Sequence, residues 1–389
     1  MLSYGRCQSK AANERLLSVL DGRNGISASL NPAESNILLG KSLIRLVPVG
    51  ARIPMRSTRL LSIGLFVYNG ERFIEEAIHS ILNQTFTDFE LIISDNASTD
   101  STCEIVEAYA KCDDRIRYYR SEKNMGAGWN ARRVYELATG KYFRWTAVDD
   151  LLEPDLLRRC VEVLESDPGC VLAHTRTKEV DENGTFIQNY VQPMKTDYDD
   201  PVARFSEIFL WGGDKCYQIY GVMRMSALRQ IPPQGIYVNA DGVLLARMSL
   251  LGRFYEIPEY LFISRRHSRQ SMATLPQRMK QPRRFRLTSR YNRSLPSLEW
   301  WDPARSRTIT FPEFRRLLEY FLSIYRAPLG TGQKVRCYRV LLFWIKTNFR
   351  GMLEDLLIAA DQVLYNLQVP NSASTNLQKQ TDWAARPRL

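Results

Sequence analysis

The sequence predicts an α/β protein in which helices cover both faces of a mostly parallel sheet. Three observations carry this prediction. Short apolar runs alternate with longer segments whose apolar residues lie three and four positions apart, and clusters of Asn, Asp, Gly and Ser separate the two kinds of segment. Strands that are joined through helices of this length pair in parallel by right-handed crossovers.

The first predicted strand is the apolar run LLSIGLFV, which starts at Leu60 and is typical of a strand buried on both faces. Tyr68-Asn69-Gly70 then turns the chain into a helix. The predicted elements that follow are a helix with its apolar stripe at 73–82, a strand at 89–94, a helix around 105–109, a strand at 116–119, a short helix that ends at Gly140, a strand at 142–148, a helix opened by Pro154, a strand at 170–176 and helices between about 310 and 368.

Length and composition exclude several classes of protein. The chain has 389 residues, 44% of them hydrophobic, which is enough for a large core and for two or three domains. Collagen-like, wholly disordered and disulfide-scaffold proteins are thereby excluded. The seven scattered cysteines include no C-x-x-C pair, which favours a reducing compartment over a structural zinc site. The sequence has no run of ~18 apolar residues and no secretory signal pattern, so we expect a cytoplasmic protein.

The net charge of +11 is concentrated in one segment. Between Glu259 and Glu299 there is no acidic residue, whereas ten basic residues occur: Arg265, Arg266, Arg269, Arg278, Lys280, Arg283, Arg284, Arg286, Arg290 and Arg293. This run is either a solvated stretch, a clamp for a diphosphate, or a contact with an anionic membrane or with nucleic acid. We expect no nucleic-acid partner, because the run has few aromatic residues for base stacking and the chain has no recognisable binding module.

Three loops are candidates for a ligand site, because ligands of parallel sheets bind at the carboxyl ends of the strands. The loops are 68–71, 95–100 and the pair Asp149-Asp150. Two adjacent carboxylates repel each other unless a cation compensates them, so the acidic pair predicts a divalent metal, with a helix N-cap before Pro154 as the alternative.

The other two loops allow both a binding and a purely structural interpretation. The loop 95–100 offers hydrogen-bonding groups for a nucleoside, although the same residues suit an ordinary turn and helix cap. Tyr68 either offers an aromatic face on which a base stacks or is a buried tyrosine of the core. Gly126-Ala127-Gly128 lacks the third glycine and the strand context of a dinucleotide fingerprint, and no P-loop motif occurs, so hydride transfer and P-loop chemistry are excluded.

Taken together, the segment LLSIGLFVYNGERFIEEAIHSILNQTFTDFELIISDNASTDST resembles the opening of the family 2 glycosyltransferases. The similarity continues through Asn124-x-Gly126, Asn130, Ala138-x-Gly140-Lys141-Tyr142 and Asp149-Asp150. It is dense from about 60 to 183 and weaker to about 271. The resemblance implies a GT-A fold and an inverting, hexosyltransferase-type reaction that moves a sugar from a nucleotide-sugar to a glycan or lipid-linked acceptor, as in polysaccharide biosynthesis.

The resemblance also implies roles for single residues. The nucleotide-sugar would contact a set of residues from the three loops and from the glycine segment: Tyr68, Asn69, Asp95, Asn96, Asn124, Gly126, Asn130 and Asp149. A divalent metal, Mg²⁺ or Mn²⁺, would be held by Asp150 and His267, the latter in the segment ISRRHSRQS that resembles the Y-R-x-H-x-x-S element of the family. Asp241 precedes the family-like segment GRFYEIPEYL and stands at the position of the general base.

With these roles the chain divides into five regions: a poorly ordered extension (1–58), a GT-A domain (59–275) with a nucleotide-binding part (59–183) and an acceptor part (184–275), a basic connector (276–310), a helical region (311–368) and a disordered tail (369–389). We expect 1–54 to be dispensable and translation to start at Met55. The helical region either packs on the GT-A domain or docks on the inner face of the membrane. The rival function is a catalytically silent nucleotide-sugar or membrane-surface binding protein.

Overall fold

The computed structural model describes residues 59–191, 194–210, 216–237, 239–268, 270, 301–305 and 308–368. The described residues all lie in one compact unit of the chain, Arg59–Leu389. The predictions for 1–58, for most of the basic connector and for 369–389 lie outside the described residues.

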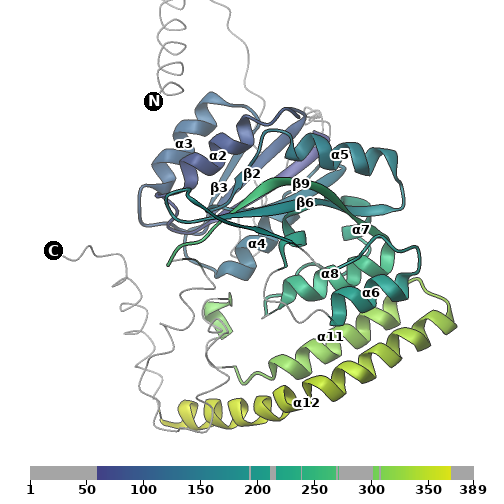
Figure 1. The fold of residues 1–389 in the computed structure, drawn as a ribbon. Helices are drawn as coiled ribbons and strands as arrows, with labels where there is room; N and C mark the ends of the chain where they lie inside the picture. The colour runs from purple at the N-terminus through teal and green to yellow at the C-terminus, as the bar shows by residue number, and fades with distance from the viewer. Residues whose placement is uncertain are drawn as a thin grey trace, which may run out of the picture. The chain divides into compact units, whose positions relative to one another are not determined.

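The first half of the central sheet is parallel, as the sequence predicts (Figure 1). In spatial order its strands are β3 (Ile116–Arg120), β2 (Phe89–Asp95), β1 (Leu61–Val67) and β4 (Tyr142–Ala147). All three neighbouring pairs are parallel. The carboxyl ends of β1, β2 and β4 therefore lie along one edge of the sheet, which brings the three candidate loops together.

The second half of the sheet is mixed, while the sheet as a whole remains mostly parallel, as the sequence predicts. β8 (Val222–Arg224) pairs antiparallel with β4 and with β6 (Cys170–Val180), while β6 pairs in parallel with β9 (Arg253–Arg265). The short strand β5 (Leu151–Leu152) directly follows the acidic pair and joins β9 in antiparallel orientation. This pairing fixes the acidic pair against the end of β9. The hairpin strand β7 (Phe186–Tyr190) pairs with β6.

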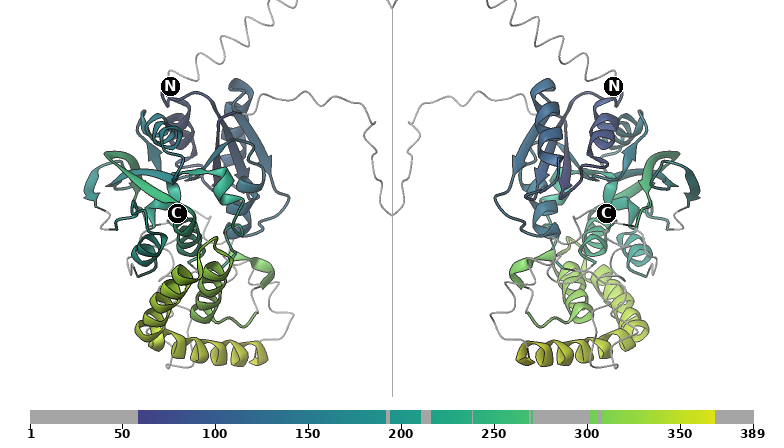
Figure 2. Two further views of the ribbon diagram at one scale, coloured as in Figure 1. Left: turned by 90° about the vertical axis from the view of Figure 1, so that its right-hand side faces the viewer. Right: turned by 90° about the vertical axis from the view of Figure 1, so that its left-hand side faces the viewer.

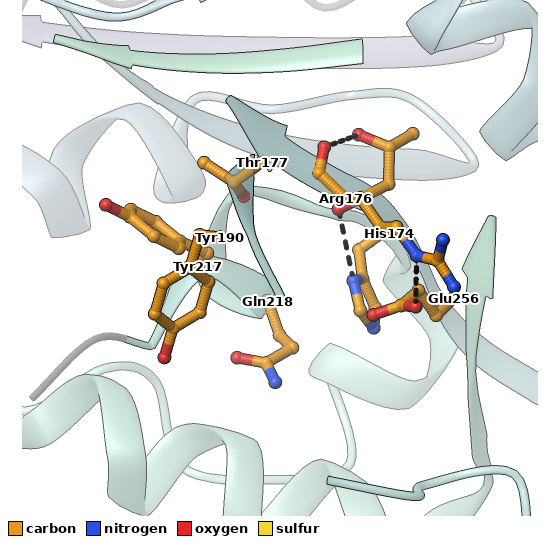
Figure 3. A pocket seen from close by; sticks show the side chains of 8 residues that line it. His174, Arg176, Thr177, Tyr190, Tyr217, Gln218 and Glu256 are labelled. Atoms are coloured by element: carbon orange, nitrogen blue, oxygen red, sulfur yellow. Dashed lines mark hydrogen bonds and ion pairs between the residues drawn. The ribbon is translucent and has the colours of Figure 1, made fainter. Parts of the chain in front are cut away.

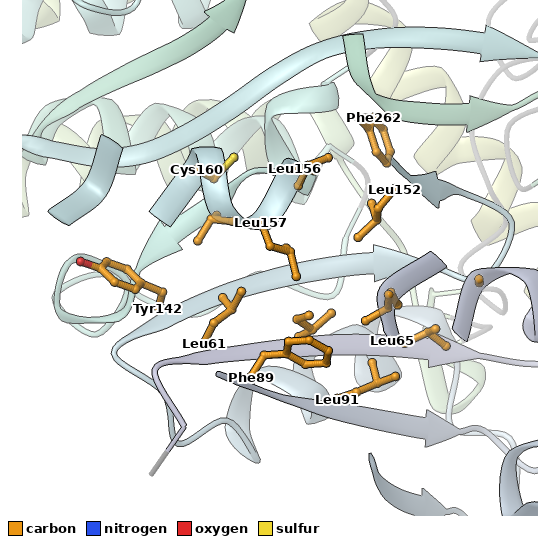
Figure 4. Close-up of a cluster of buried hydrophobic side chains, with 14 of the residues drawn as sticks. Leu61, Leu65, Phe89, Leu91, Tyr142, Leu152, Leu156, Leu157, Cys160 and Phe262 are labelled. Carbon is orange, nitrogen blue, oxygen red and sulfur yellow. The ribbon is translucent and has the colours of Figure 1, made fainter. Parts of the chain in front are cut away.

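Helices cover both faces of the sheet, as the sequence predicts. One hydrophobic core joins β1 and β2 to the apolar stripes of α2 (Ile74–Leu82), α3 (Thr102–Cys112) and α5 (Leu156–Ser166) (Figure 4). The opposite face carries a second core with α4 (Ala127–Glu136), α7 (Met225–Leu228) and α8 (Ala240–Leu251).

A third core connects the sheet domain to the C-terminal helices. It joins α6 (Pro201–Leu210) and α8 to α11 (Pro312–Arg326) and α12 (Thr331–Gln368). Two short 3-10 segments, η1 (Tyr217–Tyr220) and η3 (Pro303–Arg305), complete the described elements. α11 and α12 lie together at one end of the domain (Figures 1 and 2). Among the described residues, no helix is long and apolar enough to span a membrane.

Polar contacts also fix the C-terminal helices. Arg247 of α8 forms a buried ion pair with Glu319 of α11 at 2.5 Å and donates a hydrogen bond to Ser323 at 3.1 Å. The buried Asp355 of α12 accepts hydrogen bonds from the first backbone amides of α11, those of Glu313 and Phe314, at 2.7 and 3.0 Å, and so caps that helix. Packing of the helical region on the GT-A-like domain, one of the two expected roles, is therefore present.

The buried face of α12 generates a stability prediction. Trp344 is 3% exposed within the third core, whereas its neighbour Phe343 is 55% exposed. We expect Trp344→Ala to lower the free energy of unfolding by about 3–5 kcal/mol, because it leaves a cavity between α12, α6 and α11. Phe343→Ala is the control and should change it by less than ~0.5 kcal/mol. Denaturant unfolding followed by circular dichroism measures both, and equal effects of the two variants would contradict the shared core.

Candidate functional site

The loops that follow β1 and β2 interlock through hydrogen bonds. Asn69, whose φ of 53° is positive, donates from its backbone amide to Ser98 Oγ at 2.9 Å and accepts a bond from the Thr99 amide at 2.8 Å. The amide of Gly70 donates to Thr102 Oγ1 at 2.9 Å. Tyr68 at the tip of this arrangement is 43% exposed, so the core interpretation of this tyrosine is wrong and its ring faces solvent.

Asp95 is fully buried at the end of β2 and its carboxylate is already bound by protein groups. It accepts hydrogen bonds from the Ser98 amide and from the Tyr118 hydroxyl, each at 2.8 Å, and Arg120 Nε lies 3.5 Å away. Asp95 therefore holds the loop in shape. Beside it, Ala97, Arg120, Ser121 and Glu122 line an open hollow of about 390 Å³.

The glycine segment that leads into α4 is tied to the same loop through Asn96. The side chain of Asn96 donates to Asn124 Oδ1 at 2.8 Å and to the Gly126 carbonyl at 3.2 Å, and it accepts a bond from the Met125 amide at 2.9 Å. Gly126 has a φ of 90°, and a Cβ there would lie 2.5 Å from the Trp301 carbonyl oxygen. Both constraints require glycine.

Asn130 lies inside this arrangement. It is 2% exposed on α4, and its side-chain amide donates to the carbonyls of Val67 and Ser94 at 3.1 and 3.0 Å, at the carboxyl ends of β1 and β2. This geometry gives Asn130 a supporting role beneath the loops. The sequence does not reveal that its side-chain donors are already used within the protein.

The two carboxylates after β4 have different surroundings. Asp150 is 7% exposed and accepts a hydrogen bond from the Arg265 amide at 3.2 Å. Burial, followed by repulsion from Asp149, raises the pKa of Asp150 well above its usual value. Asp149 is more accessible, with a side chain that is 21% exposed, and its Oδ2 lies 3.0 Å from His267 Nε2.

His267 comes to the acidic pair from the end of β9, as the resemblance implies. Its ring packs on Phe73 with the centroids 4.9 Å apart, and its side chain is 7% exposed. Nε2 contacts Asp149, while the buried Nδ1 has no hydrogen-bond partner within the described part of the chain. An imidazole beside a carboxylate, with its other nitrogen unpartnered, is a donor set suited to a cation or a ligand.

Arg265 is the functional residue that the sequence analysis missed, since it counted as one member of the basic run. Its side chain is 4% exposed and forms an ion pair with Glu76 of α2. It also donates to the backbone carbonyls of Asp149 and Glu182 at 3.3 and 3.1 Å, and its guanidinium lies 4.7 Å from the centre of the Phe73 ring. Arg265 thus compensates the charge of this region and fixes the backbone of the acidic pair.

Asp241 lies at the start of α8, after Asn239, whose φ of 62° is positive. Its only described hydrogen bond from another residue is that of the Gly242 amide, at 2.8 Å, and burial raises the pKa of its carboxyl group. The half-buried Tyr220 lies near all three carboxylates: burial and then the charges of Asp150, Asp149 and Asp241 raise its pKa. Tyr220 therefore lies within electrostatic range of Asp241 and of the acidic pair.

A second cavity lies away from these loops, between β6, β7 and η1 (Figure 3). Its volume of about 10 Å³ suits a single water molecule. Its lining residues are His174, Thr175, Arg176, Thr177, Tyr190, Tyr217, Gln218 and Glu256. None of them is a residue that the sequence analysis assigned to the site.

Comparisons with known proteins agree with this geometry. The family model described as glycosyl transferase family 2 matches residues 62–224. Chondroitin synthase of Escherichia coli is 33% identical over 135 residues, which are 35% of this chain and 20% of that protein. Hyaluronan synthase of Pasteurella multocida is 31% identical over 130 residues, 33% of this chain and 13% of that protein. The chain thus spans only a small part of the length of these two curated relatives.

The fold resembles a solved structure over most of the chain. The structure of S. aureus TarS 1-349 in complex with UDP-GlcNAc superposes with a TM-score of 0.51 at 16% sequence identity, covering 75% of this chain and 72% of that chain. Full S. aureus TarS superposes with a TM-score of 0.50 and covers 74% of this chain and 43% of that chain. The GT-A fold that the resemblance implies is thereby confirmed.

The contacts of Asn130 generate a prediction that separates support from ligand binding. Asn130→Ala removes both donors to the buried carbonyls of β1 and β2, so we expect the free energy of unfolding to fall by about 1–3 kcal/mol. Arg132→Ala, on the exposed side of the same helix, is the control and should cost less than ~1 kcal/mol. An Asn130→Ala variant of unchanged stability would contradict the supporting role.

Proposed function

We propose that this glycosyltransferase, a member of family 2 through its residues 62–224, moves a sugar from a nucleotide-sugar to a hydroxyl group of a glycan or lipid-linked acceptor with inversion at the anomeric carbon. The observation that carries the proposal is that three groups of suitable chemistry lie on separate elements. A loop cluster suited to a nucleoside and a carboxylate with a histidine lie after the strands of the sheet, and a carboxylate of raised pKa lies in the first turn of α8.

The donor side supports the nucleotide part of the proposal. Tyr68 presents an exposed ring for a base, and the hollow beside Asp95 and Arg120 opens at the carboxyl end of β2. The backbone carbonyls and amides of this loop are held in place by the hydrogen bonds of Asp95 and Asn96. A preformed loop of this kind binds a nucleoside without a large cost of ordering.

The donor set at the acidic pair fits Mg²⁺ or Mn²⁺. These cations take few protein ligands and complete their coordination with substrate phosphates and water. Asp149 and His267 would hold the ion, because Asp150, which the sequence analysis favoured, is buried and engaged by the Arg265 amide. Within the described residues no third His, Cys, Asp or Glu joins them. When bound, the metal supplies positive charge to the departing diphosphate.

Asp241 is proposed as the base of the reaction. A single carboxylate takes the proton from the acceptor hydroxyl as that oxygen forms its bond to the anomeric carbon and the bond to the diphosphate breaks. Its raised pKa makes Asp241 a stronger base than an ordinary carboxylate once it is ionised. The acceptor side would therefore lie at the start of α8.

The role of Asp241 predicts a large effect on turnover. Asp241→Asn preserves the volume and the hydrogen bond from Gly242 but removes the basicity, so we expect kcat to fall by roughly 10²-fold or more with little loss of donor affinity. The measurement is nucleoside diphosphate release across a panel of nucleotide-sugars and acceptors. Turnover of the variant at the wild-type level would refute the assignment, whereas absence of release by the wild type with every donor and acceptor would favour the silent binding protein.

The raised pKa of Asp241 predicts the pH dependence of the wild type. The base acts only when ionised, so kcat/KM should fall as the pH drops through this pKa, and the acid limb should lie above the ordinary carboxyl range near ~4. Asp241→Asn should lose this limb. A limb that persists unchanged in the residual activity of the variant would assign it to another group.

The metal assignment predicts different effects for the two adjacent carboxylates. Donor affinity measured by calorimetry should increase with Mn²⁺ in the wild type, and this increase should disappear in Asp149→Asn and in His267→Ala. Asp150→Asn is the matched variant, and it should retain the metal dependence because its oxygen still accepts the bond from the Arg265 amide. The reverse pattern would restore Asp150 as the principal ligand.

A further inference from the structure

The C-terminal helix pair exposes an unusual amount of apolar surface. Of the 21 large hydrophobic side chains that are exposed in the described residues, twelve lie on α11 and α12. We call this set the outer face of the hairpin: Phe314, Leu318, Phe321, Tyr325, Val335, Leu342, Phe343, Phe349, Leu353, Leu356, Leu357 and Val363. Exposed apolar sets of this extent mark interaction sites.

The spacing of these residues places most of them on one side of each helix. On α12, a row repeats every seven residues: Val335, Leu342, Phe349, Leu356 and Val363. On α11, steps of four, three and four residues join Phe314, Leu318, Phe321 and Tyr325. Phe321 contacts Tyr338 of α12 with the ring centroids 5.1 Å apart, so the two helices meet at this surface. The apolar row of α11 and the apolar row of α12 therefore form one continuous surface.

Packing within the chain does not explain the outer face, because other residues of α12 already serve the third core. Cys337, Leu341 and Trp344 are at most 3% exposed and contact α6, α8 and α11. α12 is therefore apolar both on the side that packs in the third core and on the outer face. Among the described residues, only the first of these sides is covered. α12 lies along the end of the domain, with no other described element beyond it (Figures 1 and 2).

The charges around the outer face have one sign. From 312 to 357, every exposed charged side chain of the described chain is basic: Arg315, Arg326, Arg336, Arg339, Lys346 and Arg350. Of the acidic residues of this stretch, Glu313 and Asp355 are buried and Glu319 pairs with Arg247, while Glu354 is partly exposed. Arg339, Lys346 and Arg350 have no ion-pair partner among the described residues, and their spacing of seven and four residues sets them beside the apolar row of α12.

We propose that the outer face of the hairpin docks on an anionic lipid bilayer, with the apolar rows in the headgroup boundary and the basic row against the lipid phosphates. A helix surface with a wide apolar side and a cationic edge has the form of an interfacial membrane helix. A second copy of the chain fits this face less well. Pairing two such faces would bring the uncompensated rows of Arg339, Lys346 and Arg350 together.

Vesicle co-sedimentation of the full chain tests the proposal. We expect binding to vesicles with about 30% phosphatidylglycerol in phosphatidylcholine, weak binding to pure phosphatidylcholine, and a decrease at high salt, because basic residues near an anionic surface are screened over a Debye length. Absence of binding to the anionic vesicles at low salt would overturn the proposal. The readout is binding, so failure of the proposed reaction would leave it unaffected.

Two pairs of substitutions assign the binding to this face. Lys346→Glu with Arg350→Glu, and separately Leu342→Gln with Phe349→Gln, should each lower the partition coefficient by about tenfold or more. Ile187→Gln, a similarly exposed apolar side chain on β7, is the matched control and should bind as the wild type does. A midpoint temperature of thermal unfolding equal to that of the wild type shows that each variant retains the fold.

Two further outcomes would contradict the docking face. Wild-type binding in both hairpin double variants, with loss of binding in Arg283→Ser/Arg284→Ser/Arg286→Ser, would assign the membrane contact to the basic run of the sequence. A concentration-dependent dimer in light scattering that disappears in Leu342→Gln/Phe349→Gln, without lipid binding by the wild type, would assign the face to a second copy of the chain.

Discussion

Two neighbouring carboxylates at the end of a buried strand impose the constraint on which the site depends. Asp149 and Asp150 repel each other, and neither can be buried without compensation. The compensation comes from β9, which delivers the amide and guanidinium of Arg265 to the pair, and then His267. β9, in the second half of the sheet, is thus part of the site, because Arg265 and His267 at its end compensate the charge of the acidic pair.

The proposed base depends on a different part of the structure. Asp241 lies in the first turn of α8, whose later residues are mostly buried in the second and third cores, and Arg247 of that helix is anchored to α11 by a buried ion pair. Breaking such a pair by removing one partner leaves an uncompensated charge, which costs several kcal/mol. The C-terminal hairpin therefore helps to position the proposed base, while the parallel half of the sheet positions the loops proposed to bind the donor.

The parallel half of the sheet and its helices were predictable, because buried strands appear as continuous apolar runs and their polar ends appear as loops rich in Asn and Asp. β9 was not predictable, since exposed residues such as Tyr255 interrupt its pattern and its partner β6 lies far away in the sequence. The different exposure of Asp149 and Asp150 was not predictable for the same reason. Which of two adjacent side chains turns inward is decided by the pairing of β5 with β9, a contact between distant segments.

The contact between Gly126 and the Trp301 carbonyl limits how this protein can be recombined with its relatives. A C-terminal half grafted from another enzyme would have to bring its backbone equally close to Gly126. Any side chain at position 126 would push the two halves apart. The two halves can therefore be exchanged independently only if residue 126 stays glycine. Chimaeras joined within the stretch that precedes Trp301 inherit this requirement, whichever sugars their parents transfer.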